Sequence, residues 1–128
     1  MFEYEILQFL IKHPELTYNG IERNQKNPRY KEQRVDLFQN LAEIDKCMEW
    51  LDKIYVPSSR KKDETSSYAL KHYVEKYYRE YISNGAFVTA IMMKGDDYKT
   101  LNNNPNVFIK LHPRPLEEHR FLYKNNCS

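Results

Sequence analysis

The sequence has few glycines, few cysteines and no long hydrophobic run. Three glycines in 128 residues argue against glycine-rich phosphate loops and long flexible linkers. Two cysteines, Cys47 and Cys127, cannot build a disulfide framework in a chain of this size, so a reducing compartment is expected. No apolar run reaches the roughly 18 residues of a membrane span, and acidic residues precede the first apolar run where a signal peptide would be basic. These absences predict a soluble cytoplasmic protein that does not enter a membrane.

Catalytic and metal-binding motifs are also missing from the sequence. No G-x-S-x-G, H-E-x-x-H, Walker loop or paired C-x-x-C occurs. His112, His119 and Cys127 lack the spacing of metal ligands, and His72 with Glu75 forms a single H-x-x-E, which is too common to indicate a metal. We therefore expect no catalytic residues, no metal and no cofactor, and predict a protein that is not an enzyme.

The composition is that of one folded domain. Hydrophobic residues make up 41% of the chain and aromatic residues 14%, well above the level typical of disorder. The net charge of +2 is too small to indicate nucleic-acid binding by itself. Residues 65–128 nevertheless carry nine Lys and Arg against six Asp and Glu, so the basic excess lies in the second half. We expect a mainly α domain of four or five helices, with at most a short β segment near residues 107–111.

The first half of the chain is expected to contain two helices. Apolar spacing predicts a short helix over Phe2–Lys12, followed by a connector with its turn at Asn19–Gly20. A long helix is predicted over Pro28–Tyr55, with Asn27 as its N-cap. A stripe at alternating steps of four and three runs along this helix and consists of Leu37, Leu41, Ile44, Met48, Leu51 and Tyr55. The stripe indicates packing inside the molecule, with a homodimer contact along the same seam as the alternative.

The second half is expected to contain the core helical pair. One helix is predicted from Ser66 or Ser67 to about Tyr81, and another over Asn84–Lys94, with Ser83 as N-cap and Gly95 after its end. The expected organisation is a helical part (1–56), a polar linker (57–65), the helical pair with an extended segment (66–111), and a tail with a short helix (112–128).

A helical wheel separates two faces on the segment from Tyr68 to Tyr81. The predicted core arc contains Leu70, Tyr73, Val74, Tyr77 and Tyr81. The opposite, predicted solvent-facing arc contains Tyr68, Lys71, His72, Glu75, Lys76, Tyr78 and Arg79. Aromatic rings among cations are typical of single-stranded nucleic-acid sites, where bases stack on the rings and phosphates meet the cations.

The candidate binding residues are accordingly Tyr68, Lys71, His72, Lys76, Tyr78 and Arg79. The same residue types also form hot spots in protein interfaces, and the charged ones could simply form ion pairs between successive helical turns. A helix-turn-helix reader is disfavoured because the helix over Asn84–Lys94 is apolar nearly all round, where a recognition helix must be polar. We expect that helix to be core.

The turn Ser83-Asn84-Gly85 has two interpretations. Free N–H groups at a helix start, with a glycine that permits close approach, could contact a phosphate. The simpler interpretation is an ordinary N-cap.

Residues 66–111, about a third of the chain, resemble a family of small uncharacterised proteins of bacteriophages, prophages and related mobile elements. Three motifs carry the resemblance: S-S-Y-A-L-K-H-Y-V-E at Ser66–Glu75, Y-I-S-N-G-A-F-V-T-A at Tyr81–Ala90, and N-N-P-N-V-F-I-K-L at Asn103–Leu111. The resemblance implies an accessory or anti-defence protein in the cytoplasm of a bacterial host. Such proteins bind nucleic acid or occlude a host complex, as anti-CRISPR proteins do. The resemblance implies no catalytic residues.

The sequence therefore predicts a non-enzymatic binding protein of phage or mobile-element origin. Its expected partner is RNA, DNA or a nucleoprotein complex, bound by the basic, tyrosine-bearing helix. The alternative is a protein–protein adaptor or a homodimeric module that binds no nucleic acid.

Overall fold

The structure is a computed structural model that describes residues 3–54, 64–95 and 98–110. The elements in chain order are α1 (Glu3–Lys12), β1 (Leu16–Thr17), β2 (Gly20–Ile21), α2 (Tyr30–Phe38), α3 (Leu41–Ile54), β3 (Glu64–Ser66), α4 (Ser67–Tyr78), α5 (Asn84–Lys94), β4 (Lys99–Thr100) and β5 (Val107–Lys110). Helices dominate and the strands are short, which confirms the predicted mainly α fold. Within the described ranges, no helix combines the length and hydrophobicity needed to cross a bilayer.

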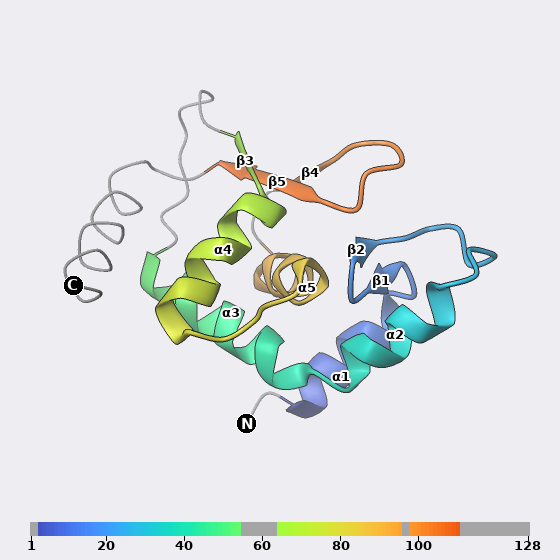
Figure 1. Ribbon diagram of the computed structural model, residues 1–128, viewed down its shortest axis with the longest axis horizontal. Helices are drawn as coiled ribbons and strands as arrows, with labels where there is room; N and C mark the ends of the chain where they lie inside the picture. The colour runs from blue at the N-terminus through green and yellow to red at the C-terminus, as the bar shows by residue number, and fades with distance from the viewer. Residues whose placement is uncertain (1–2, 55–63, 96–97, 111–128) are drawn as a thin grey trace.

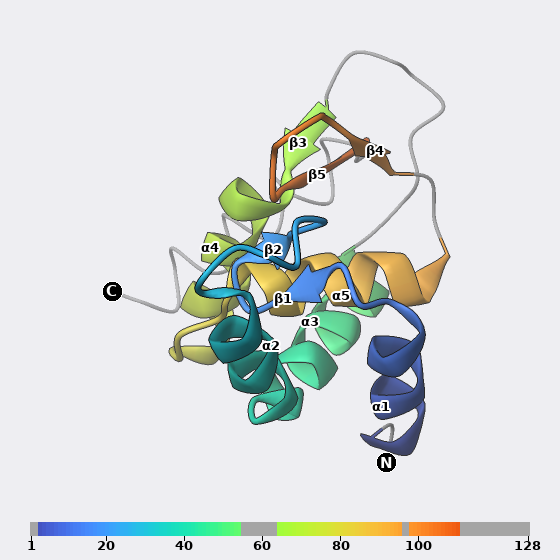
Figure 2. The ribbon, with the colours of Figure 1, turned by 90° about the vertical axis from the view of Figure 1, so that its right-hand side faces the viewer.

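Helix α5 is the centre of the domain. It lies between α3, α4 and the β1–β2 hairpin, with the three-stranded sheet on one side and α1 and α2 on the other (Figure 1; Figure 2). All eight residues from Asn84 to Ile91 are buried. The predicted limits of this helix are confirmed, because the Ser83 hydroxyl caps its start and Gly95, with φ of 73°, ends it.

The predicted long helix from Pro28 to Tyr55 is wrong, because it is divided into α2 and α3. Asn40 separates them: its side-chain amide donates to the Asp36 carbonyl at 2.7 Å, and its own carbonyl accepts from the Glu43 N–H at 3.1 Å. An asparagine side chain that bonds to the preceding turn competes with continued helix. The 3–4 spacing of apolar residues continues across the break, so periodicity could not reveal it.

The apolar stripe of α2 and α3 faces the core of its own chain. Leu37, Ile44 and Leu51 are buried, and Leu41 and Met48 pack partly buried against them. Trp50 beside the stripe meets Phe87 of α5 edge-on, with ring centroids 5.9 Å apart. The packing of Leu37, Ile44 and Leu51 is therefore intramolecular, as expected, and these three buried side chains are not accessible to a homodimer contact. Tyr55, its last residue, lies outside the described residues.

The β structure exceeds the predicted single segment. The expected strand over 107–111 is confirmed as β5, which pairs antiparallel with β3 on one edge and β4 on the other. Strands β1 and β2 form a hairpin with Leu16 opposite Ile21, so its turn is Tyr18–Asn19, one residue earlier than predicted. Strands of two or three residues are too short to show alternation in the sequence. Residues 57–63 of the predicted linker and the predicted tail helix lie outside the described residues.

Arg34 of α2 holds the hairpin in place. Its guanidinium donates to the carbonyl oxygens of Leu10, His13 and Leu16 at 2.7–3.1 Å. These charge-assisted bonds join α2 to the end of α1 and to β1. They place the Tyr18–Asn19 turn beside the start of α5.

Candidate functional site

Helix α4 carries the predicted binding face, and it is shorter than expected. The Ser66 hydroxyl caps its start by accepting from the Ala69 N–H at 3.2 Å. The helix ends at Tyr78 because Arg79 adopts the left-handed conformation with φ of 57°. The Glu80 N–H then donates a hydrogen bond to the Glu75 carbonyl at 3.2 Å. Tyr81 is therefore not part of the helix, and a wheel cannot place it.

Two of the six predicted surface residues do not face solvent. Lys71 is only 4% exposed. Tyr78 is partly buried against the core, and its hydroxyl donates to Glu49 at 2.6 Å. Conversely, Tyr77 and Tyr81, which the wheel assigned to the core, are 43% and 62% exposed. The buried face of α4 is thus rotated from the predicted one. Lys71 points inward and pairs with Glu75, and the helical wheel had placed both residues on the solvent side.

The other four predicted residues are exposed as expected. Tyr68, His72, Lys76 and Arg79 all lie on the solvent side of α4 or at its end. The His72 ring stands perpendicular to the Tyr68 ring at 5.0 Å, and its Nδ1 lies 2.8 Å from a Glu75 oxygen. Within the described part of the chain, Lys76 and Arg79 form no ion pair. Their charges are therefore available to an anionic ligand.

Lys71 is enclosed by two tyrosine rings and one carboxylate. Its ammonium lies 5.2 Å from the Tyr68 ring centre and 4.7 Å from that of Tyr81, both within cation–π range. It donates to Glu75 at 3.2 Å, and Glu75 also accepts from the Ile82 N–H at 3.1 Å. Burial disfavours the Glu75 carboxylate, but these two donors outweigh it and lower the pKa of Glu75. The ion pair and the rings hold each other in place.

A small hollow of about 130 Å³ opens beside Lys71. The residues that line it are Tyr18, Asn19, Arg29, Gln33, Asp36, Tyr68, Lys71, Tyr81 and Asn84. We call it the tyrosine hollow. The Tyr18 and Tyr81 rings lie 6.3 Å apart at 40°, and the exposed faces of Tyr68 and Tyr81 border the opening. Arg29 and Asp36 place one charge of each sign in the lining of the hollow, and the Lys71 charge is already paired with Glu75. The planar rings suit a flat ligand that can stack on them.

Sequence reasoning missed Tyr18, Arg29 and Tyr81 as members of this site. Tyr18 lies in a segment that was expected to be a connector, and only the hairpin brings it to α4 and α5. Its hydroxyl donates to Glu43 at 2.7 Å. Burial and then this hydrogen bond raise the pKa of Tyr18, so the ring is fixed as a neutral phenol. No local sequence signal identifies a contact between residues this far apart.

The turn Ser83-Asn84-Gly85 does not provide a phosphate site. The Ser83 N–H donates to Glu43 at 2.8 Å, and the Gly85 N–H donates to the Tyr18 carbonyl at 2.9 Å. The Ser83 hydroxyl accepts a hydrogen bond from the Ala86 N–H. All three residues are buried. The phosphate interpretation is therefore wrong and the N-cap interpretation holds, because the protein itself occupies the donors at this helix start.

Asn84 and Gly85 instead join three parts of the fold. The Asn84 side chain accepts from the Ser67 hydroxyl at 2.8 Å and donates to the Asn19 carbonyl at 3.0 Å. Ser67 also accepts from the Val107 N–H at 3.2 Å. These bonds connect α5 with α4, β5 and the hairpin, so Ser67, Asn84 and Gly85 position the elements that form the tyrosine hollow.

The described residues contain no metal-ligand cluster, and their one cysteine is buried. Among them, no three His, Cys, Asp or Glu side chains are grouped so as to hold a metal ion. Cys47 is fully buried, and burial raises the pKa of its thiol. A buried thiol of raised pKa is a poor nucleophile.

Comparisons with protein-family models, with curated proteins and with solved structures found no match to this chain. The resemblance of residues 66–111 to a phage family stays a prediction.

Proposed function

We infer that this protein is a non-enzymatic binding protein that holds single-stranded nucleic acid at the tyrosine hollow. An accessory or anti-defence role of the anti-CRISPR type, on the ligand alone or in a nucleoprotein complex, fits this proposal. The observation that carries it is the pair of exposed rings, Tyr68 and Tyr81, arranged around the ammonium of Lys71. Large aromatic side chains rarely stay exposed in such a group unless something covers them.

The charges around the rings support this ligand class. Arg29 borders the hollow. Lys76 lies on α4, which also carries Tyr68, and Arg79 lies at the end of α4; neither has a paired carboxylate among the described residues. Bases stack on aromatic rings, while phosphates follow cations, so rings and free cations in one region match a flexible single strand. Duplex DNA would need a polar helix or ribbon in its major groove, and α5 is buried.

Fluorescence anisotropy with labelled single-stranded RNA, single-stranded DNA and duplex oligonucleotides tests the proposal. The single strands should bind and the duplex should bind more weakly. Tyr68→Ala or Tyr81→Ala should each remove one stacking contact worth about 1–3 kcal/mol, which is a loss of affinity of about 5- to 150-fold. Tyr4→Ala is the matched control, since Tyr4 is 72% exposed on α1, away from the hollow. Melting curves show that each variant is folded.

Salt dependence separates the charged contribution. If Arg29, Lys76 and Arg79 meet three phosphates, log K should fall against log salt with a slope of about −2. Lys76→Gln should make the slope less steep, whereas Lys12→Gln on α1 should not. Failure of every oligonucleotide to bind at low salt would refute the proposal. Equal losses of affinity in Tyr68→Ala and in the control Tyr4→Ala would also refute it.

The adaptor alternative rests on the same exposed tyrosines, since Leu37, Ile44 and Leu51 of the predicted seam are buried within their own chain. Affinity purification from a bacterial host, with retained RNA, DNA and proteins identified together, distinguishes the two. A stoichiometric host protein that is lost in Tyr81→Ala, without nucleic acid, would favour the adaptor.

A further inference from the structure

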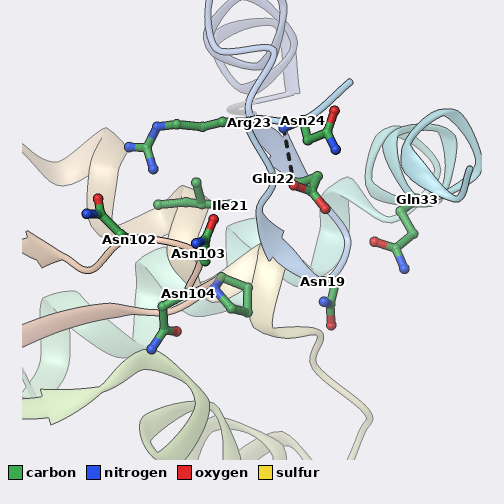
Figure 3. A pocket seen from close by; sticks show the side chains of 10 residues that line it. Asn19, Ile21, Glu22, Arg23, Asn24, Gln33, Asn102, Asn103 and Asn104 are labelled. Carbon is green, nitrogen blue, oxygen red and sulfur yellow. Dashed lines mark hydrogen bonds between the residues drawn. The ribbon is translucent and has the colours of Figure 1, made fainter. Parts of the chain in front are cut away.

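A second, larger hollow adjoins the tyrosine hollow. It has a volume of about 690 Å³ and lies between the segment that follows the β1–β2 turn and the loop that joins β4 to β5. Side-chain amides dominate its walls: Asn19 and Gln33 on one side, and Asn102, Asn103 and Asn104 on the other (Figure 3). We call it the amide cleft.

The cleft is built before any ligand arrives. The Ile21 N–H donates to the Pro105 carbonyl at 2.9 Å, which fixes the hairpin against the β4–β5 loop. Gly20, with φ of 123°, permits this approach, because a Cβ there would lie 2.3 Å from the Pro105 carbonyl oxygen. Asn104 shapes the loop by accepting from the Asn106 N–H at 2.9 Å. Ile21 and Pro105 supply an apolar floor between the walls.

Several amides of the cleft have no hydrogen-bond partner among the described residues. The side chains of Asn19, Gln33, Asn102 and Asn103 form no hydrogen bond with any residue that the structure describes. Each presents a donor and an acceptor side by side. This is the arrangement that pairs with the edge of a nucleobase, most favourably with adenine.

The charge of the cleft differs from that of the tyrosine hollow. Only Glu22 and Arg23 carry charge there, and the two are opposite in sign. Glu22 is already engaged, since it accepts from Asn27 at 2.7 Å and from the Asn24 N–H at 3.2 Å. A neutral cleft of amides over an apolar floor suits the uncharged base of a nucleotide rather than its phosphate.

The two hollows share two wall residues. Asn19 and Gln33 line both the tyrosine hollow and the amide cleft. A single strand whose base stacks on Tyr81 can therefore place a neighbouring base in the cleft without leaving the surface. The shared walls make one composite site with a stacking half and an edge-reading half.

We propose that the amide cleft is a base-selective subsite for an unpaired adenine of a bound single strand. This proposal rests on the proposed function and deepens it, because stacking on tyrosine tolerates every base whereas amide pairing does not. The protein then prefers strands that carry adenine at one position, and that preference resides in Asn102 and Asn103, neighbouring amides that line the amide cleft and not the tyrosine hollow.

The test uses labelled oligouridylates of about 12 nucleotides, either unmodified or with adenines, cytosines or guanines at the centre, each as RNA and as DNA. The wild type should bind the adenine probe about 5- to 150-fold more tightly than the unmodified one. The double variant Asn102→Ala/Asn103→Gly should bind all probes like the unmodified one and keep the wild-type salt slope, and glycine retains the positive φ of 57° at Asn103. Gln8→Ala, an exposed amide on α1, is the matched control and should keep the preference.

The outcomes separate this proposal from the one on which it rests. Tyr81→Ala should weaken all probes together and leave the ratio between them unchanged. Equal binding of all four probes by the wild type, or a preference that survives in the double variant, overturns the adenine subsite while single-strand binding stands. Absence of binding to every probe overturns both proposals.

Discussion

Replacing Gly85 by alanine tests the contact that organises the site. A Cβ at this position would lie 1.8 Å from the Thr17 carbonyl oxygen and 2.7 Å from the carbonyl group of Tyr18. These are backbone atoms of the hairpin, so no side-chain rotation can relieve the clash. The hairpin would have to withdraw by roughly 1.5 Å to restore van der Waals distances. That shift breaks the Gly85–Tyr18 hydrogen bond of 2.9 Å and strains the Asn84–Asn19 bond.

The cost can be estimated from these changes. Overpacking of a closely packed contact costs about 1–3 kcal/mol, and each lost hydrogen bond costs about 1 kcal/mol. Alanine recovers up to about 1 kcal/mol through its better helix propensity. We expect Gly85→Ala to lower the free energy of unfolding by about 3 kcal/mol. This is a large part of the about 5–15 kcal/mol that stabilises a typical domain.

Urea denaturation followed by circular dichroism measures this change as a midpoint lower by about 1–2 M. Gly95→Ala is the control, because no atom lies within 4 Å of the added Cβ and only the positive φ of 73° is unfavourable. That conformation should cost about 1–2 kcal/mol. If Gly85→Ala proves no less stable than Gly95→Ala, the hairpin does not pack on α5 as described.

Two further predictions concern buried polar groups. The lowered pKa of Glu75 means that its carboxylate stabilises the fold above its ordinary pKa of 4.5, and that this stabilisation is lost as pH falls through the lower folded value. Glu75→Gln should therefore cost about 3 kcal/mol at pH 7, because it leaves Lys71 buried and unpaired. Its urea midpoint should lie below that of the wild type at pH 7, and the difference should shrink below about pH 4.5. The exposed control Glu32→Gln should show little difference at either pH, and a difference for Glu75→Gln that does not change with pH would contradict this mechanism. Ser67→Ala should cost about 1–3 kcal/mol in the same assay, because it removes the hydrogen bonds to the Asn84 amide oxygen and from the Val107 N–H. An unchanged midpoint would refute this network.

The limits of α5 and the stripe on α3 were predictable because their signals are local. Ser83, Gly95 and the apolar run between them predict α5, and the structure has the same limits. The break between α2 and α3 at Asn40 was not predicted. The Asn40 side chain ends the helix by its hydrogen bond to the Asp36 carbonyl, while the helical spacing of apolar residues continues on both sides of the break. The short strands carry no alternation, so only their pairing partners define them.

The sequence by itself determined a mainly α domain with α5 at its core, because caps and apolar periodicity act within a few residues of one another. It also placed Tyr68, His72, Lys76 and Arg79 on the surface. Only the tertiary structure decided that Lys71 points inward, since a wheel gives the angles between side chains but not the side on which neighbours pack. Glu75 and the rings of Tyr68 and Tyr81 make that burial tolerable. The tyrosine hollow and the amide cleft likewise exist only because the hairpin docks on α5, a contact between residues distant in the chain.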